Sequence, residues 1–312
     1  MKIGVIGAGF WGKKHVEEYT NLKHQVYVSD LSSENLSFCE TNFRSIPVKN
    51  YNDIILDDEI VAVSICSPNS THYKFAKEAI EAGKAVLIEK PIAESTVQAN
   101  DLISLAKSRK IPLLVGHIFR FNNAIKKARD IVNHGTLGKI YHVNIDWTSL
   151  ENVFPDRDIL SDLAVHPIDI LDNLFEGCPK NVICGGMSFR QKNFETSVIT
   201  YDLHINEKDS IFVTINLSWL SPLKTRRMLI VGSDKTLQVE CTSQQIKIIE
   251  NISKNVIDEK IIPNNTIRDE LEYFIKCCSE MQEPLSPYPT GEIGKRVLQV
   301  IETANNFALK NN

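Results

Sequence analysis

The chain has 312 residues, 43% hydrophobic and 24% charged, a formal net charge of -4, and seven cysteines. This length and composition favour a soluble globular protein of two domains. The near-neutral charge, with no long block of lysine and arginine, argues against nucleic acid or a charged membrane as partner, and the scattered cysteines without a CxxC pair argue against disulfide and zinc frameworks.

The first predicted elements are a strand at 2–6, a glycine-rich turn and a helix at 13–20. The turn reads GAGFWG, which is GxGxxG in the order that a dinucleotide fingerprint requires. Such a sequence provides a tight turn, a close approach of the backbone to a pyrophosphate, and a helix start that favours anions. A chance glycine turn is the alternative. We predict cofactor contacts from five residues of this turn: Gly7, Gly9, Phe10, Trp11 and Gly12.

A second strand, 25–29, ends in Asp30. A carboxylate at this place can accept hydrogen bonds from the ribose hydroxyls of the adenosine and repels a 2'-phosphate. The following residues, Leu31, Ser32 and Ser33, include no arginine that could hold such a phosphate. We therefore predict NAD as the cofactor, with NADP less favoured.

A continuous apolar run at 60–66 predicts a central parallel strand, followed by a polar loop and a helix at 73–82. Because parallel strands place their ligands at their carboxyl ends, this loop is a candidate cofactor contact. The residues that we take from it are Ser67, Pro68, Asn69 and His72.

The next strand, 85–88, delivers Glu89, Lys90 and Pro91 to the same edge of the sheet. Alone, Lys90 would be an ordinary surface lysine, but after a dinucleotide fingerprint it becomes a catalytic candidate, and Glu89 a cofactor contact. A helix at 95–108 and a strand at 112–115 follow. This alternation of strand and helix predicts a parallel sheet.

The segment at 116–122 reads GHIFRFN, and its Arg120 is a further candidate cofactor contact. Beyond this segment the regular alternation of strand and helix ends. Helices are expected at 123–134 and 159–175, and two more close the chain at 266–281 and 290–309. Most of the remainder reads as strands joined by turns, which predicts a large, mostly antiparallel open sheet. The strands are expected at 139–149, 182–189, 196–205, 210–218, 226–231, 236–240 and 245–250. We predict two domains, a doubly wound Rossmann domain at 1–120 and an α/β domain at 121–312.

In this second half, Asp162 and His166 stand four residues apart in DLAVHPID. On a helix these positions share a face, so a carboxylate can orient an imidazole; Pro167 implies a kink or a helix junction there. A histidine packed against its own helix is the alternative. Pocket walls are expected from the region near Arg120 and from four residues, Trp147, Thr148, Arg157 and Asp158. For each of them a buried anchor or a surface group is the alternative.

The sequence GAGFWG, the EKP at 89–91, GHIFRFN and DLAVHPID together resemble the Gfo/Idh/MocA family of oxidoreductases over nearly the whole chain. The resemblance implies a Rossmann domain, a second domain whose open sheet often forms an oligomer interface, and catalytic roles for Lys90, Asp162 and His166, with a Lys90–Pro91 peptide that is often cis. The segment at 154–169 is most similar to the nucleotide-sugar branch, which includes UDP-N-acetylglucosamine 3-dehydrogenases. Many relatives carry a GG pair before the aspartate, where this chain has RDILS.

These observations predict a cytoplasmic NAD-dependent dehydrogenase acting on a secondary alcohol of a sugar or nucleotide sugar, without a metal, as a homo-dimer or homo-tetramer. His166 is the expected base, and a neutral Lys90 in that role is the alternative. Two other functions stay open: an NAD-dependent glycoside hydrolase of the same fold, and a non-enzymatic NAD-binding sensor.

Overall fold

The computed structural model describes residues 1–153 and 158–311. By its internal contacts the chain divides into two compact units, Met1–Ile118 with Asn265–Lys295, and Phe119–Asn264 with Arg296–Asn312. The predicted ranges, 1–120 and 121–312, differ from these units because α8 (Thr266–Glu280) returns to the first unit. Its apolar side chains join the core cluster of the first sheet, where they are buried: Leu271, Phe274 and Cys278.

The first unit holds a six-stranded sheet in the order β3-β2-β1-β4-β5-β6, and every pair in it is parallel. This confirms the predicted doubly wound sheet, in which the strand order reverses between β1 and β4 and ligands bind beside their carboxyl ends. The strands are β1 (Lys2–Ile6), β2 (Gln25–Ser29), β3 (Ile46–Val48), β4 (Ile60–Ile65), β5 (Ala85–Ile88) and β6 (Leu113–Val115).

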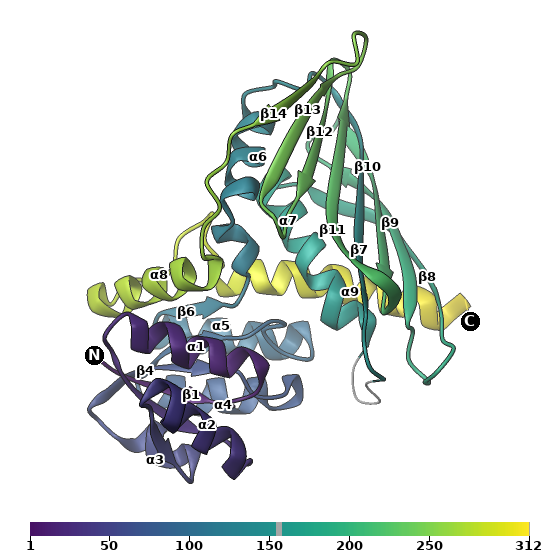
Figure 1. The fold of residues 1–312 in the computed structure, drawn as a ribbon. Helices are drawn as coiled ribbons and strands as arrows, with labels where there is room; N and C mark the ends of the chain where they lie inside the picture. The colour runs from purple at the N-terminus through teal and green to yellow at the C-terminus, as the bar shows by residue number, and fades with distance from the viewer. Residues whose placement is uncertain (154–157, 312) are drawn as a thin grey trace. The chain divides into compact units, whose positions relative to one another are not determined.

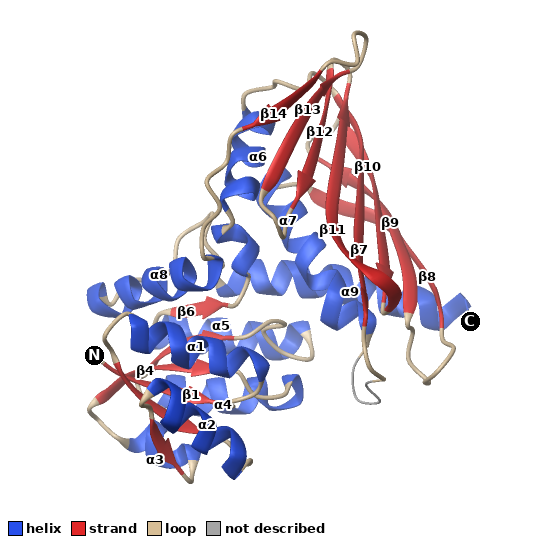
Figure 2. Ribbon diagram, in the orientation of Figure 1, coloured by secondary structure: helices blue, strands red, loops and turns tan. Residues whose placement is uncertain are grey.

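Helices cover both faces of this sheet (Figures 1 and 2). The buried side of α1 has the spacing of an amphipathic helix, with Gly12, His15, Val16 and Tyr19 facing inward, and α8 packs beside it. The helices of the unit are α1 (Phe10–Asn21), α2 (Ser33–Phe43), α3 (Tyr51–Leu56), α4 (Asn69–Glu81), α5 (Thr96–Arg109), α8 and the start of α9 (Gly291–Asn311).

Four short elements were not predicted: β3, α3, η1 (Ile118–Phe121) and β14 (Val256–Glu259). Each is too short to show a period in the sequence. Strand β3 also carries Pro47, which fits only because β3 is an edge strand of its sheet.

The second unit holds an eight-stranded sheet in the order β14-β13-β12-β11-β7-β10-β9-β8. Among the described strands of this second sheet, only β7 and β10 pair in parallel, and the other pairs are antiparallel. The prediction of a mostly antiparallel sheet is therefore confirmed. Its strands are β7 (Ile140–Leu150), β8 (Cys178–Met187), β9 (Thr196–His204), β10 (Ser210–Ser218), β11 (Leu220–Gly232), β12 (Lys235–Glu240), β13 (Gln245–Glu250) and β14.

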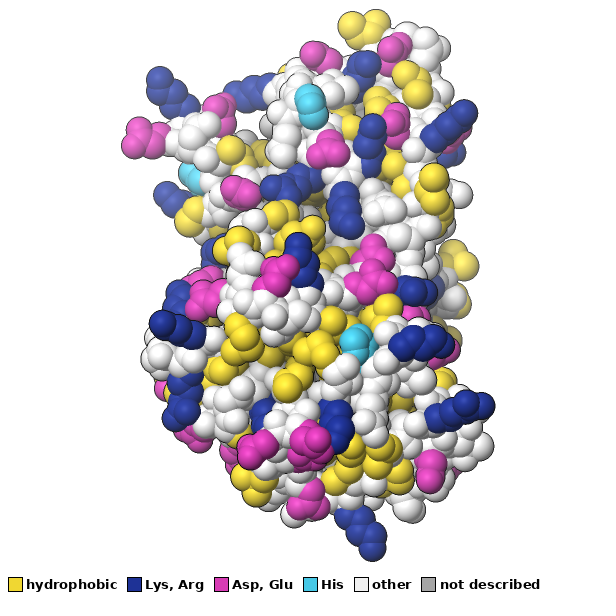
Figure 3. All heavy atoms as spheres, turned by 90° about the vertical axis from the view of Figure 1, so that its left-hand side faces the viewer, with side chains coloured by type: hydrophobic (Ala, Val, Ile, Leu, Met, Phe, Trp, Pro, Cys, Tyr) yellow, Lys and Arg dark blue, Asp and Glu magenta, His cyan; other side chains and the backbone are white. Residues whose placement is uncertain are grey.

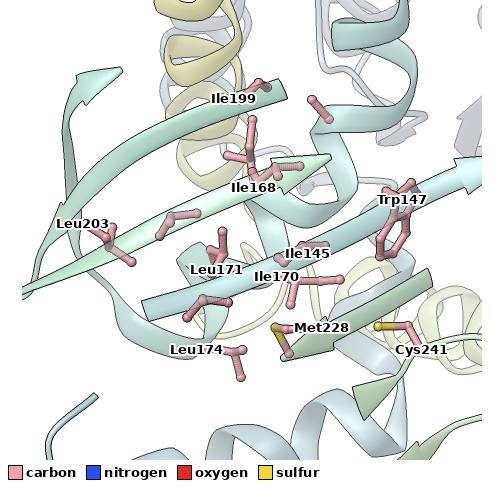
Figure 4. Packing of buried hydrophobic residues seen from close by; sticks show 14 of the residues in the cluster. Ile145, Trp147, Ile168, Ile170, Leu171, Leu174, Ile199, Leu203, Met228 and Cys241 are labelled. Atoms are coloured by element: carbon pink, nitrogen blue, oxygen red, sulfur yellow. The ribbon is translucent and has the colours of Figure 1, made fainter. Parts of the chain in front are cut away.

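One face of the eight-stranded sheet is covered by helices, and buried and partly exposed residues alternate strictly along the middle of β7. Ile168 and Leu171 of α7 (Val165–Phe175) belong to the same buried cluster as Ile145 of β7 and Leu203 of β9 (Figure 4). Burying each such side chain stabilises the unit by about 1.5–3 kcal/mol. The helical segments of the unit are η1 (Ile118–Phe121, its first residue in the other unit), α6 (Asn123–Asn133), η2 (Leu160–Ala164), α7 (Val165–Phe175) and the rest of α9.

The face of the molecule drawn in Figure 3 carries basic and acidic side chains interspersed, with hydrophobic ones between them. Within the described residues, no helix combines the length and the apolar character needed to cross a bilayer.

Candidate cofactor and substrate sites

The turn after β1 requires two of its glycines for packing. Gly7 has a φ of +94°, and a side chain there would bring a Cβ within 2.6 Å of the Ser67 nitrogen. At Gly12 a Cβ would lie 1.9 Å from the Gly7 carbonyl oxygen, so α1 lies directly on the turn. At Gly9, by contrast, a Cβ would meet no atom within 4 Å. The open space at Gly9 therefore suits a ligand that approaches the backbone.

The amino terminus of α1 follows Gly9, and no side chain caps it. Its first turn carries no acidic residue either, so its N–H groups and dipole remain available to an anion. Phe10 is 72% exposed, and its ring lies edge-on to that of Trp11 at 5.5 Å between centroids. These two residues are therefore expected to contribute through their backbone.

Asp30 lies at the carboxyl end of β2, as predicted, and is partly exposed. Its carboxylate accepts the N–H of Ala8 at 2.5 Å and that of Ser32 at 2.7 Å, and the Asn35 amide at 3.3 Å. Asp30 therefore fixes the glycine turn to the start of α2. This held carboxylate fits a ribose diol beside the turn.

The loop after β4 leads into α4, and His72 of this helix contacts the backbone of the loop. The His72 ring is buried, with Nδ1 2.8 Å from the Pro91 carbonyl oxygen and Nε2 2.9 Å from that of Ser67. Burial lowers the pKa of His72, although both carbonyl contacts oppose this. The buried His72 ring thus joins two loops. Contacts of Ser67, Pro68, Asn69 and His72 with the cofactor stay predictions.

Glu89 and Lys90 follow β5 at the same edge of the sheet. The Lys90–Pro91 peptide is cis, as the resemblance implied, and Lys90 is partly exposed. Glu89, predicted as a cofactor contact, is buried, and its carboxylate lies against His15 and the Lys90 N–H. Glu89 thus holds the backbone of Lys90, and its contact with the cofactor stays a prediction.

In the second unit Arg120 is buried. Its guanidinium donates to Asp169 at 2.6 Å and to Asp172 at 2.6 Å. Asp172 also receives two bonds from Arg296, at 2.8 and 2.9 Å. This network binds η1, α7 and α9 together, and a contact of Arg120 with the cofactor stays a prediction.

Asp162 and His166 lie on successive helical segments. Asp162 belongs to the π-helical segment η2 and His166 to the first turn of α7, where Pro167 is tolerated. The predicted junction before Pro167 is therefore present, but a π segment has a longer turn than the α-helix assumed for the i, i+4 pairing. Both residues are partly exposed. Direct contact between them stays a prediction.

Aromatic rings fix the orientation of His166, which the sequence did not indicate. The imidazole stacks on Trp147 at 5.7 Å and 28°, and Phe119 lies edge-on to it at 5.4 Å. Trp147, expected as a pocket wall, is 0% exposed and serves as the support of this stack. Thr148 and Asp158 are partly exposed, and Arg157 lies outside the described residues.

The sequence did not indicate a role for Arg226 of β11 either. Its guanidinium carbon lies 5.0 Å from the centroid of the Trp147 ring, and it donates to the Thr148 carbonyl at 2.6 Å. Burial lowers the pKa of Arg226, while the charges of Glu151 and Asp162 act in the opposite direction. His166 therefore shares the Trp147 ring with the cation of Arg226, whose pKa the charge of Asp162 acts to raise. Phe119 is the second aromatic ring beside it.

Comparison with known proteins gives this arrangement a family. The model of an oxidoreductase family with an NAD-binding Rossmann fold matches residues 1–117, and the GFO/IDH/MocA C-terminal domain model matches residues 125–238. The chain belongs to the Gfo/Idh/MocA family. The predicted oxidoreductase class and NAD-binding fold are thereby confirmed.

Among the relatives, an uncharacterised oxidoreductase, YrbE, of Bacillus subtilis is 25% identical over 76% of this chain and 70% of its own length. The UDP-N-acetylglucosamine 3-dehydrogenase of Acidithiobacillus ferrooxidans is 31% identical over 54% of this chain, and the match spans about half of that protein, 53%. Its solved structure covers 99% of this chain and 97% of its own with a TM-score of 0.86 at 24% identity. Levoglucosan dehydrogenase, solved with NADH and levoglucosan, covers 100% and 98% with a TM-score of 0.86 at 17% identity. These structures show that their fold extends over 99–100% of this chain.

Proposed function

We propose that this Gfo/Idh/MocA protein is an NAD-dependent dehydrogenase that transfers a hydride between a secondary alcohol of a sugar or nucleotide sugar and NAD. The observation that carries the proposal is the edge of the first sheet. There the uncapped start of α1, the open space at Gly9, the carboxylate of Asp30 and Lys90 all follow strands of one parallel sheet.

The first unit would hold the cofactor by two contacts. The N–H groups at the start of α1 would bind the pyrophosphate, and Asp30 would accept the ribose hydroxyls while repelling the additional phosphate of NADP. Bound NAD would supply the hydride acceptor. The chain's own residues would place the alcohol and manage its proton.

Lys90 and His166 are proposed to handle the alcohol. His166 would take the hydroxyl proton, and its ring is already oriented by Trp147 and Phe119. Asp162 would favour the imidazolium that forms, and Lys90 would donate a hydrogen bond to the alcohol oxygen as charge develops on it. Lys90 lies in the first unit and His166 in the second, so their meeting at one substrate is part of the proposal.

A nucleotide sugar is the substrate class that we favour. The support is the likeness of this chain to a UDP-N-acetylglucosamine 3-dehydrogenase, in sequence over half the chain and in fold over all of it.

The test is the appearance of NADH when the purified protein and NAD meet a panel of free sugars, inositols, sugar phosphates and UDP-sugars. Reduction of NAD with one UDP-sugar alone is the expected result. Release of a free sugar from a glycoside without net NADH would replace the proposal by the hydrolase. Saturable NAD binding without turnover of any panel member would favour the sensor.

A further inference from the structure

A buried histidine and a buried glutamate meet beside the catalytic lysine candidate, entirely within the first unit. Nε2 of His15, on α1, is 3.3 Å from Oε1 of Glu89, which follows β5. His15 is 0% exposed and Glu89 is 6% exposed. The two atoms lack the alignment of a hydrogen bond, so the contact is electrostatic. A buried carboxylate is costly without a partner, and His15 is the partner within reach from α1.

The second oxygen of Glu89 acts on Lys90. It accepts the backbone N–H of Lys90 at 3.1 Å. Burial alone raises the pKa of Glu89, but His15 and Lys90 together bring it below its ordinary value. A Cβ at Gly116 would lie 3.1 Å from the Glu89 carboxyl group, so little space remains into which the carboxylate could move. The Glu89 side chain is therefore confined between the helix and the lysine.

His15 also belongs to the helix that begins at the glycine turn. It follows Gly12 by one helical turn, on the same buried face. Gly12 lies against the Gly7 carbonyl, so α1 cannot shift without moving the turn. A continuous series of contacts thus runs from the proposed pyrophosphate site through His15 and Glu89 to the backbone of Lys90.

We propose that His15 is a positioning residue that sets the place of Lys90 through Glu89, so that the helix expected to bind NAD also fixes the lysine expected to hold the alcohol. The role of Lys90 in this statement rests on the proposed function. The contacts between His15, Glu89 and Lys90 do not.

Other ionisable groups also face the pair and bear on any pH profile. The charge of Glu89 acts on the thiol of Cys66, which follows β4, and on the imidazole of His72 in α4. The charge of Glu270 in α8 also acts on Cys66. Burial raises the pKa of the Cys66 thiol, with Glu89 and Glu270 adding to this. A change in the Glu89 charge is therefore expected to alter more than one titration.

The experiment compares His15→Gln, Glu89→Gln and their double variant with Tyr19→Phe as the matched control. Tyr19 lies on the same face of α1 and is fully buried, with its ring edge-on to His15 at 6.3 Å between centroids. Tyr19→Phe keeps this ring contact and removes only the hydroxyl, which bonds Ser64 at 2.7 Å. Two properties are measured on the full chain: the rate at which an acylating reagent labels Lys90, followed by peptide mass spectrometry without substrate, and the kcat and KM for NAD with the sugar that the panel identifies.

We expect both single variants to change the labelling rate of Lys90 and to lower kcat roughly tenfold, with KM for NAD close to that of the wild type. The double variant should be no worse than either single one, since the two residues act in series. The control should match the wild type in both measurements. Should His15→Gln fold poorly, Glu89→Gln alone still tests the contact with Lys90, because it keeps the shape of the side chain.

Independent, additive effects of the two substitutions would overturn the proposal. So would labelling of Lys90 in His15→Gln at the wild-type rate. If no sugar is turned over by the wild type, the proposed function fails, whereas the labelling rates still decide the role of His15.

Discussion

At the scale of single residues, His166 is the side chain on which the proposed chemistry depends most. Its ring packs against Trp147 and Phe119, which also contact each other at 5.0 Å between centroids, and Arg226 lies over the same tryptophan. An imidazole in this surrounding keeps one orientation, which a proton acceptor requires before the substrate arrives.

His166→Asn is expected to lower kcat by about 10² to 10⁴, the usual contribution of a general base. Lys90→Ala is expected to impair turnover as well, by removing the hydrogen bond to the alcohol oxygen. The measurement is the steady-state rate of NADH formation with the identified sugar. If His166→Asn retained most of the turnover while Lys90→Ala abolished it, Lys90 would be the base.

Asp30 is the single residue that we expect to set the preference for NAD over NADP. Asp30→Ala is expected to weaken NAD binding and to relax discrimination against NADP, because it removes both the ribose acceptor and the carboxylate that holds Ala8. Titration of the wild type and the variant with each cofactor measures this. Ser33→Ala, just past the carboxylate on α2, is the control and should keep the preference. Equal affinity of the unaltered protein for both cofactors would contradict the role of Asp30.

At the scale of elements, the carboxylates of α7 join three helical segments through Arg120 and Arg296. Burial raises the pKa of Asp172, but the two guanidinium groups prevail and hold it below its ordinary value. A depressed folded pKa contributes stability above the unfolded value, about 3.9 for an aspartate, and loses it as the pH falls through the folded pKa.

Asp172→Asn is therefore expected to lower the free energy of unfolding by about 1–3 kcal/mol at neutral pH, because the buried Arg120 loses one of its two carboxylates and the half-exposed Arg296 loses its partner. The difference from the wild type should narrow as the pH falls below about 4. Denaturant unfolding across pH measures it, with Glu259→Gln as the control, since the exposed pair of Glu259 with Lys127 is expected to contribute less than about 1 kcal/mol. A gap that stays constant down to acid pH would contradict this account.

Much of the fold could be predicted because local periodicity is strong. The glycine turn, the apolar strand at Ile60–Ile65 and the alternation in β7 each carry a signal within one window. What could not be predicted depends on distant partners. The pairing of Arg120 with Asp169, the return of α8 and the stacking of His166 on Trp147 join residues far apart in sequence. His15 alone had a local signal, a titratable side chain on the buried face of α1.

At the scale of the whole molecule, the outer face of the eight-stranded sheet bears on assembly. Its centre is polar, with Arg227 donating to Asp146 at 2.7 Å and Asn216 donating to the same carboxylate at 2.9 Å. Phe212 and Val198 on this face are about half exposed, at 51% and 45%. An antiparallel sheet can leave such a face to water, or cover it with a second copy.

We predict a homo-dimer or homo-tetramer in which a second copy covers this face. Light scattering of the full chain should give a mass above that of one chain, and Phe212→Asp should shift it toward the monomer. Lys224→Asp, which changes a side chain at another part of β11, is the control and should leave the mass unchanged. A monomeric wild type would remove this prediction without affecting the proposed chemistry.

The central claim is that a hydride passes from a carbinol carbon to NAD. Its most direct test uses the sugar identified by the panel, deuterated at the carbon that is oxidised, with mass spectrometry of the nicotinamide product. The account predicts one deuterium in the NADH for each keto-sugar formed. Unlabelled NADH, or a released sugar with no net reduction of NAD, would contradict it.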